Sequence, residues 1–333
     1  MSLHETLSRA VVVTGGAGAI GSRLVARLLD VGVPRVVVVD DLSSGYAWLL
    51  PQNPSVRLVR TDVCDLDRVG LDVTEPVIFH LAAFFANQNS IDHPFDDLQT
   101  NGRGTLTTLT WATRQKAQRF IYASAGCSIA GHGSEAPIRE DMVPSLELDT
   151  PYQITKMLGE LYCNYFDRHL PTVRCRFFNS YGPGELPGIY RNVIPNFIWR
   201  ALHGAPLVIT GTGDETRDFI FVDDVVAGLL AAATASAARG QAINLGSGVQ
   251  TRIIDLAEIV IKACRSTSRI ELASRRPWDR SIHRETDINK AKSVLGFRPV
   301  VSVRDGVEHT IDWFRGNRER IDAAVSSSPH RLW

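Results

Sequence analysis

The segment Thr14-Gly15-Gly16-Ala17-Gly18-Ala19-Ile20-Gly21 decides the fold, because it joins an apolar strand to a helix through a glycine-rich turn. The apolar run begins at Ala10, and the helical pattern after the turn continues to a stop at Gly32. Gly15 or Gly16 permits the tight turn, Gly18 lets the backbone approach a pyrophosphate, and Gly21 lets the helix pack closely on the strand. The unpaired N–H groups that open the helix then face the anion.

Further short apolar runs alternate with helical patterns along the first half of the chain. They cover residues 35–39, 56–59, 77–81, 120–123 and 173–178. Runs of this length without polar alternation are typical of strands that are buried on both faces, in a parallel sheet covered by crossover helices. The pattern predicts an α/β fold with a Rossmann-type, doubly wound parallel sheet.

Loops rich in Gly and Pro follow Asn179, which indicates a second lobe. We expect a dinucleotide-binding Rossmann domain at residues 8–178, with returns of the chain to it at 219–245. The smaller C-terminal substrate lobe is interleaved in sequence and takes residues 179–218 and 246–320. Residues 321–333 are expected to be a tail.

Composition favours a small-molecule site. Lys and Arg number 36 and balance 36 Asp and Glu, so no overall field draws the protein to nucleic acid or to an anionic membrane. The five cysteines show neither a disulfide framework nor zinc-ligand spacing, and we expect no metal site. No apolar run approaches the roughly 20 residues needed to cross a bilayer. We expect a cytoplasmic protein.

Asp40 strengthens the interpretation of the glycine turn. It lies 19 residues beyond Gly21 at the end of the second strand, where a carboxylate can accept both ribose hydroxyls of an adenosine and repel a 2′-phosphate. The pattern therefore predicts NAD rather than NADP, although Arg57 and Arg60 nearby leave some room for the phosphate.

A pair of side chains with catalytic chemistry opens a later helix. Tyr152 and Lys156 lie four residues apart, which places them on one helix face. A nearby ammonium stabilises a tyrosinate, so the phenol can take a proton from a sugar hydroxyl while hydride leaves the same carbon for nicotinamide.

Taken together, these motifs resemble the extended short-chain dehydrogenase/reductase family of nucleotide-sugar epimerases and dehydratases. The resemblance covers nearly the whole chain and is carried by residues 14–21, Asp40, 62–63, 80–83, Asn101, 152–156, 176–183, 211–224, 244–248, 276–279 and 295–299.

The resemblance implies a set of NAD-binding residues. Asp62 and Val63 would flank the adenine, Ala82 and Ala83 would line the pyrophosphate path, and Asn101 would brace the strand edge. The full set is Gly15, Gly18, Ala19, Ile20, Gly21, Asp40, Asp41, Asp62, Val63, Leu81, Ala82, Ala83, Asn101, Lys156 and Phe178.

It also implies a nucleotide-diphosphate sugar as substrate. Arg217 and Arg276 would pair with the diphosphate, although each has an alternative as a surface ion pair, with Asp218 and Asp279 respectively. The implied substrate-binding residues are Ser124, Tyr152, Asn179, Asn192, Arg217, Arg276 and Asp279. Relatives usually form homodimers through two helices of each subunit, here 96–116 and 152–169.

The chain departs from the family where a Ser or Thr normally completes the proton relay. Ala125 occupies that position, and Ala130 stands where a tyrosine is usual. Three alternatives follow: Ser124 or Ser128 supplies the hydroxyl, Tyr152 acts without it, or catalysis is weakened or redirected.

The same stretch bears on the reaction. A 4,6-dehydratase of this family carries an Asp-Glu pair where Gly126 and Cys127 stand here. We therefore expect an epimerase, with a decarboxylase, an atypical dehydratase or a catalytically impaired binding protein as alternatives. The amides of residues 87–89 either border the sugar or cap a helix.

Overall fold

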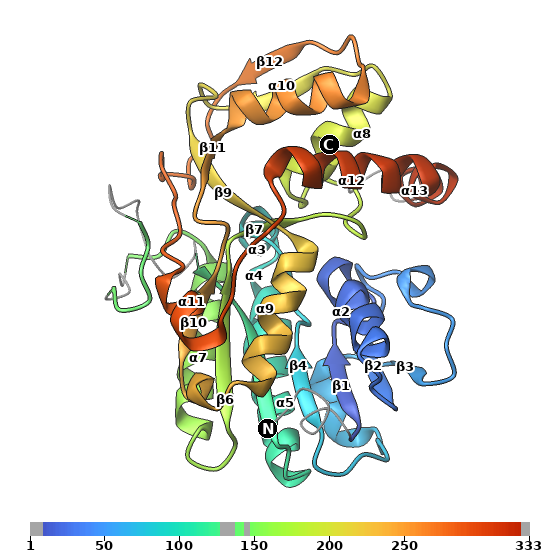
Figure 1. The fold of residues 1–333 in the computed structure, drawn as a ribbon, viewed down its shortest axis with the longest axis vertical. Coiled ribbons are helices and arrows are strands. Elements are labelled where there is room, and N and C mark those ends of the chain that lie inside the picture. Colours follow the sequence, from blue (N-terminus) through green and yellow to red (C-terminus); the bar gives the residue numbers. More distant parts are fainter. Residues whose placement is uncertain (1–8, 127–136, 143–146, 328–333) are drawn as a thin grey trace.

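A seven-stranded parallel sheet forms the larger lobe in the computed structural model, which describes residues 9–126, 137–142 and 147–327 (Figure 1). Its strand order is β10-β6-β5-β4-β1-β2-β3, and every pairing is parallel. The strands are β1 (Val11–Thr14), β2 (Val36–Asp40), β3 (Val56–Arg60), β4 (Val77–His80), β5 (Arg119–Ala125), β6 (Thr172–Phe177) and β10 (Ala242–Leu245). The predicted α/β class is confirmed.

Side chains of successive strand residues enter two separate cores. Val11 and Val13 of β1 pack with the first core, whereas Val12 packs with the second. Helices α2 (Ala19–Asp30), α9 (Val222–Thr234) and α11 (Asn289–Leu295) contribute to the first core, and α5 (Thr105–Arg114) and α7 (Pro151–Phe166) contribute to the second. The sheet is therefore covered on both faces, which explains the buried apolar runs of β1, β2 and β4, while the edge strand β3 exposes Arg57 and Arg60.

The strand order reverses at β1, because the chain runs outward to β2 and β3 on one side and to β4 on the other. Thr14 and His80, the last residues of β1 and β4, are paired in register. Ligands of doubly wound sheets bind outside the carboxyl ends of the strands at such a switch point.

The second lobe is built on smaller sheets and its own apolar core. A three-stranded sheet has the order β11-β9-β7, and β12 pairs with β8. The strands are β7 (Asn179–Tyr181), β8 (Leu207–Thr210), β9 (Thr216–Phe221), β11 (Gln250–Arg252) and β12 (Ile270–Ala273). Helices α8 (Val193–Leu202), α10 (Ile253–Cys264) and α12 (Val303–Gly316) supply much of the core. Figure 1 shows this lobe above the carboxyl end of the large sheet.

The chain passes between the lobes more than once. After β9, α9 packs against β5 and β6, and β10 joins the large sheet beside β6. The remaining short helices are η1 (Ala47–Leu49), η2 (Val63–Arg68), α3 (Asn87–Asp92), α4 (Pro94–Asp97), η3 (Leu98–Gly104) and η4 (Ser236–Ala238).

The structure differs from the expected tail, because helix α13 (Arg318–Ser326) continues beyond residue 320. Ile321 and Val325 of this helix are buried in the core of the second lobe. Ile321 and Val325 are four residues apart among mostly polar and small residues, so the sequence pattern did not indicate a packed helix here.

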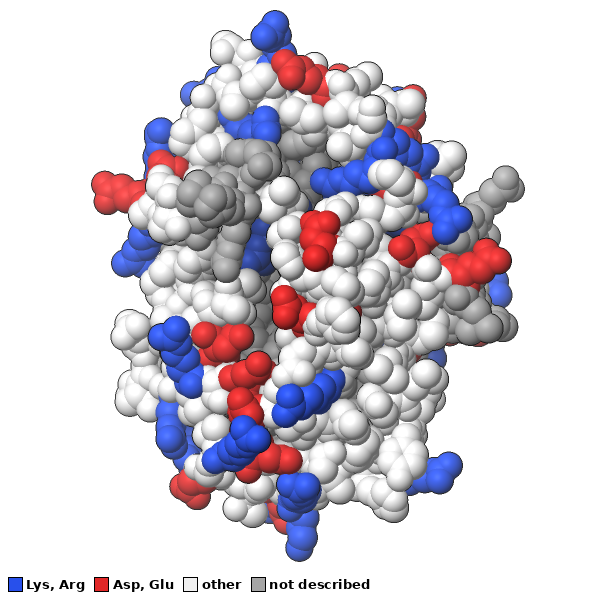
Figure 2. All heavy atoms as spheres, turned by 180° about the vertical axis from the view of Figure 1, so that it is seen from behind, with Lys and Arg blue, Asp and Glu red and all other residues white. Residues whose placement is uncertain are grey.

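The described surface carries both signs of charge side by side, as the face in Figure 2 shows. Of the residues that the structure describes, none belongs to a helix that is both long and apolar enough to span a membrane.

Candidate active site

A continuous pocket of about 600 Å³ runs from the glycine turn to the second lobe. Its lining includes Gly15, Gly18, Ala19, Ile20, Gly21, Asp40, Asp41, Asp62, Val63, Leu81, Ala82, Ala83, Ser124, Tyr152, Lys156, Phe178, Asn179, Asn192, Arg217, Arg276 and Asp279. Except for Asn101, the structure thus brings every predicted site residue together along one pocket.

The glycine turn is as tight as the sequence indicates. Gly15 has φ +68°, and a Cβ there would lie 2.6 Å from the backbone nitrogen of Ala82. A Cβ at Gly21 would lie 2.2 Å from the Gly15 carbonyl oxygen. Gly18 is the N-cap of α2 and offers no side-chain hydrogen bond to it. The opening N–H groups of α2 therefore remain available for an anion.

Asp40 is buried at the end of β2 and helps to shape the turn. Its carboxylate accepts hydrogen bonds from the backbone N–H groups of Ala17 and Leu42, both at 2.9 Å. Burial raises the pKa of Asp40, and these two bonds oppose the rise. Among the described residues that line the pocket, neither Arg57 nor Arg60 is found, so no guanidinium from β3 offsets the Asp40 carboxylate there.

Asn101 acts from behind the pocket. Its side chain accepts from the backbone N–H of Phe84 at 2.9 Å and donates to the carbonyl oxygen of Phe84 at 3.1 Å and to Asp97 at 2.7 Å. It therefore braces the segment after β4 while remaining outside the pocket lining, and its predicted role at the cofactor stays a prediction. Asp97 also accepts a hydrogen bond from Thr155 at 2.7 Å, which ties this brace to α7.

Tyr152 and Lys156 face the same end of the pocket from the first turns of α7. The ammonium of Lys156 lies 5.6 Å from the centre of the Tyr152 ring and donates to the carbonyl oxygen of Ala123 at 3.0 Å. Burial lowers the pKa of Lys156 to about 8, while the charge of Asp97 works against this fall. The ring of Phe85 packs edge-on against Tyr152, with centroids 5.9 Å apart.

The amides after β4 hold the start of α7. Asn87 accepts a hydrogen bond at 2.8 Å from Thr150, the N-cap of α7, and the backbone N–H of Tyr152 donates to Ser90 at 3.0 Å. Gln88 accepts from the indole N–H of Trp278 in the second lobe at 2.8 Å. Neither side chain caps a helix of this segment, because α3 and α4 begin at the N-caps Ala86 and His93 without side-chain cap hydrogen bonds. Asn87 and Gln88 both line the pocket, and contact with the sugar stays a prediction.

Ser124 has a strong partner away from Tyr152. Its hydroxyl donates to Glu160 at 2.7 Å, and Glu160 forms a buried, bidentate ion pair with Arg176. A relay role for Ser124 stays a prediction, as does one for Ser128. Ser128, Cys127 and Ala130 lie outside the described residues.

The ring of Phe178 occupies the space beside Gly126. A Cβ at this position would lie 2.2 Å from the ring of Phe178, which is 1% exposed and lines the pocket. A side chain at position 126, where the resemblance places an acid of the dehydratases, would therefore require the Phe178 ring to move.

The second lobe gathers the arginines that were predicted to bind the diphosphate. Arg217 donates to Asp279 at 2.7 Å, and Arg284 lies 3.5 Å from the other oxygen of Asp279. Asp218, the alternative partner of Arg217, instead accepts from Ser247 and Gly248. The Arg276 guanidinium lies 5.8 Å from the Trp278 ring centre rather than in an ion pair with Asp279.

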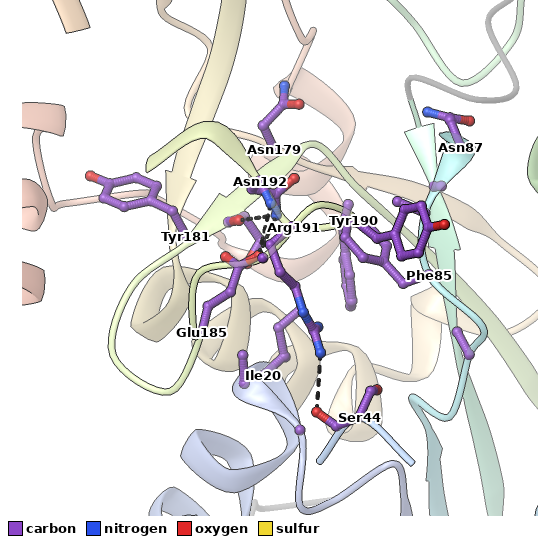
Figure 3. A pocket seen from close by; sticks show the side chains of 18 of the residues that line it. Ile20, Ser44, Phe85, Asn87, Asn179, Tyr181, Glu185, Tyr190, Arg191 and Asn192 are labelled. Atoms are coloured by element: carbon purple, nitrogen blue, oxygen red, sulfur yellow. Dashed lines mark hydrogen bonds between the residues drawn. The ribbon is translucent and has the colours of Figure 1, made fainter. Parts of the chain in front are cut away.

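The chain from β7 to α8 holds two predicted pocket residues, Asn179 and Asn192, and three further ones that the sequence did not single out. Asn192 caps α8 in extended conformation and donates to Glu185 at 3.0 Å (Figure 3). Burial raises the pKa of Glu185 to about 7. Asn179 donates to the carbonyl oxygen of Asp218 at 3.0 Å. Glu185, Tyr190 and Arg191 line the pocket without belonging to a spacing motif.

These residues fit a bound dinucleotide. The glycine turn leaves room that Cβ atoms would fill, the α2 N-terminus faces the pocket, and carboxylates stand at the expected ribose end. Among the described residues, no group of His, Cys, Asp and Glu side chains is placed to hold a metal ion.

Comparison with known proteins agrees with this geometry. Residues 11–246 match the NAD dependent epimerase/dehydratase family. The structure of epimerase Mth375 from Methanothermobacter thermautotrophicus is 43% identical, with a TM-score of 0.93 over 97% of this chain and 98% of that one. The Bordetella bronchiseptica enzyme WbmF, solved with NAD⁺ and UDP, is 36% identical, with a TM-score of 0.87 over 98% of both chains.

Among curated proteins, the UDP-glucose 4-epimerase of Mycolicibacterium smegmatis is 35% identical over 92% of this chain and 99% of its own length. Family, fold and cofactor predictions agree with all three comparisons. The chain is an NAD-dependent enzyme and belongs to the NAD-dependent epimerase/dehydratase family of extended short-chain dehydrogenases/reductases.

Proposed function

We propose that this enzyme is a 4-epimerase of a nucleotide-diphosphate sugar, with a UDP-hexose or UDP-hexuronate as substrate. The observation that carries the proposal is the pairing of Tyr152 and Lys156 in the pocket that contains the glycine turn, with a glycine at position 126 packed against the buried ring of Phe178. The UDP bound to WbmF and the printed activity of the mycobacterial relative support the choice of nucleotide.

The residues of the chain supply acid–base chemistry and orientation. The phenol of Tyr152 takes the proton of the sugar hydroxyl, and the Lys156 ammonium stabilises the resulting phenolate. NAD, when bound, accepts the hydride from that carbon and later returns it. The 4-keto sugar turns over before the return, and Tyr152 gives the proton back, so the net change is inversion at one carbon.

The second lobe holds the nucleotide part of the substrate during this turn. We assign diphosphate contacts to Arg217 and Arg276, with Asn179 and Asn192 beside them, and the nucleotide ribose to Asp279. Arg217 and Arg284 already orient the Asp279 carboxylate. Fixing the nucleotide while leaving the sugar free to rotate is what epimerisation requires.

The test is a product analysis in D₂O. The holoenzyme is incubated separately with UDP-glucose, UDP-glucuronate and UDP-N-acetylglucosamine, and the products are followed by NMR. We expect the C4 epimer of one sugar without deuterium at C4. Loss of carbon dioxide or of water would instead assign a decarboxylase or a dehydratase.

Tyr152→Phe separates catalysis from binding. Removal of the acid–base group is expected to lower the rate by about 10²- to 10⁴-fold, with UDP binding retained. Tyr162→Phe, on the same helix but outside the pocket lining, is the matched control and keeps activity. A wild type that binds NAD and UDP but turns over none of the three sugars would assign a binding protein.

We also propose that the enzyme is a homodimer. Ile154, Leu161 and Tyr165 of α7 are exposed, with Leu161 at 57% and Tyr165 at 61%. Phe95 of α4 and Leu98 of η3 are exposed as well, and both elements pack beside α7. The apolar surface made by these five side chains suits a second copy related by a two-fold axis.

A cytoplasmic location is a further proposal. Cys64, Cys163, Cys175 and Cys264 are free, buried thiols. Free thiols are typical of a reducing compartment. Fractionation of the native host with an antibody to the enzyme would test the location.

A further inference from the structure

The side chain of Arg191 reaches from the second lobe to the loop that follows Asp40. Its guanidinium donates to the carbonyl oxygen of Ser44 at 3.1 Å (Figure 3). Both residues line the pocket. The contact therefore crosses the pocket between the lobe that binds the substrate nucleotide and the lobe that carries the glycine turn.

The loop that Arg191 meets is fixed against the glycine turn. The backbone N–H of Tyr46 donates to the carbonyl oxygen of Ala17 at 2.9 Å, and a Cβ at Gly45 would lie 2.9 Å from the carbonyl carbon of Ala17. Figure 3 shows the Arg191 side chain directed at Ser44, and Ile20, in the first turn of α2, lines the same pocket. Arg191 is thus placed at the end of the pocket where a pyrophosphate meets the α2 N-terminus.

The distribution of charged side chains along the pocket makes Arg191 the cation best placed to meet the pyrophosphate. Of the described cationic residues in the lining, Arg200, Arg217, Arg276 and Arg284 belong to the nucleotide end in the second lobe, and Lys156 stands beside Tyr152. Carboxylates of Asp40, Asp41 and Asp62 line the adenosine end. A dinucleotide pyrophosphate carries two negative charges, and among the described cationic residues that line the pocket Arg191 is the one bonded to the loop beside the glycine turn.

The segment that carries Arg191 is held on both sides. Asn196 accepts from the backbone N–H of Gly188 at 2.9 Å and donates to its carbonyl oxygen at 3.0 Å. The hydroxyl of Tyr190 donates to Asp92 in the larger lobe at 2.9 Å. The Asn192 side chain turns to Glu185 and Ser180, away from Ser44. Residues 191 and 192 therefore serve opposite sides of one rigid turn.

We propose that Arg191 is a cofactor-retaining residue that binds the pyrophosphate of NAD from the second lobe. The bond to the Ser44 carbonyl uses one of the five N–H donors of the guanidinium and sets its position. The remaining donors form charge-assisted hydrogen bonds with the pyrophosphate oxygens. Because Asn192 is the next residue, this bond links retention of the cofactor to the part of the pocket that holds the substrate.

The first test measures release of NADH from the enzyme by fluorescence after mixing with excess NAD⁺. Arg191→Ala is expected to release NADH about 10- to 100-fold faster, the range that loss of a charge-assisted hydrogen bond predicts. Arg191→Lys keeps the charge and should show a smaller increase. Arg35→Ala is the control, because Arg35 pairs with Asp72 at the opposite end of β2 and should release NADH as the wild type does.

The second test distinguishes direct binding of the pyrophosphate by Arg191 from an indirect effect of Arg191 on the loop that contains Ser44. Arg191→Ala should lower the affinity for ADP-ribose by about 10-fold or more. The affinity for adenosine, which has no pyrophosphate, should stay within about twofold of the wild type. Equal losses for both ligands would reduce Arg191 to a brace for the loop. Unchanged NADH release together with weakened UDP binding would assign Arg191 to the substrate, and either result overturns the proposal. Both readouts are independent of turnover.

Discussion

The hydroxyl of Ser124 donates a 2.7 Å hydrogen bond to Glu160, whose two carboxylate oxygens also receive the guanidinium of Arg176. All three residues are buried. This network joins β5, α7 and β6 directly behind the catalytic helix. It gives Ser124 a structural partner, while the alternatives in which Ser128 supplies the hydroxyl or Tyr152 acts without one stay open.

Ser124→Ala should therefore affect stability more than catalysis. We expect the free energy of unfolding to fall by about 1 to 3 kcal/mol, because a buried carboxylate loses a donor, while kcat falls only a few-fold. Urea denaturation and steady-state kinetics of the same preparation measure the two effects. A loss of kcat beyond about 100-fold at unchanged stability would return Ser124 to the proton relay.

Ala125→Ser should restore the hydroxyl that relatives carry. Ala125 is buried and lines the same pocket as Tyr152 and Lys156, so the added oxygen would enter the pocket that holds these two side chains. We expect kcat to rise by about 10-fold, at the low end of acid–base effects. The double variant Ala125→Ser with Tyr152→Phe is the control and should show no gain. Equal gains in both backgrounds would mean that the hydroxyl acts independently of the phenol.

The pH dependence of kcat/KM should report Lys156. Its pKa of about 8 lies below the ordinary 10.5, because burial disfavours the ammonium. The charged form that supports the phenolate is complete well below pH 8 and is lost as the pH rises through that value, so kcat/KM should decline above about pH 8. In Lys156→Arg the guanidinium stays charged throughout this range, and this decline should vanish, whatever the absolute rate. A wild-type profile that stays flat from pH 7 to 10 would contradict the assignment.

Leu161→Arg should separate the proposed dimer. Leu161 is exposed in the single chain and lies in the middle of the apolar surface of α7. In a dimer formed through this surface, an arginine at this position would be buried without an ionic partner, which opposes association. Light scattering after size-exclusion chromatography should give a mass near 36.7 kDa for the variant and twice that for the wild type. Leu272→Arg, on β12 and 62% exposed, is the control and should leave the mass unchanged. A monomeric wild type would refute the dimer outright.

Local patterns predicted much of the fold and of the cofactor end. The apolar run before Gly15, the glycine spacing and Asp40 all lie within one βαβ unit, where chain proximity fixes their relation. Tyr152 and Lys156 were predictable for the same reason, since one helix turn places them together.

Contacts between distant segments were harder to predict. Arg217 pairs with Asp279 across 62 residues rather than with its neighbour Asp218, because β9 turns the Asp218 carboxylate toward Ser247. The bond of Arg191 to Ser44 spans 147 residues and belongs to no spacing motif. Such pairings depend on how the two lobes pack together, which short-range periodicity does not describe.

The ring of Phe178 also limits how this enzyme can acquire another activity. Because the ring occupies the space beside Gly126, any side chain there must first displace a fully buried aromatic group. A mutational route to an acid at 126 therefore needs a smaller residue at 178 first, and the intermediate variant would carry a void in the lining of the pocket. The close contact between Gly126 and Phe178 thus ties any change of side chain at one position to a change at the other.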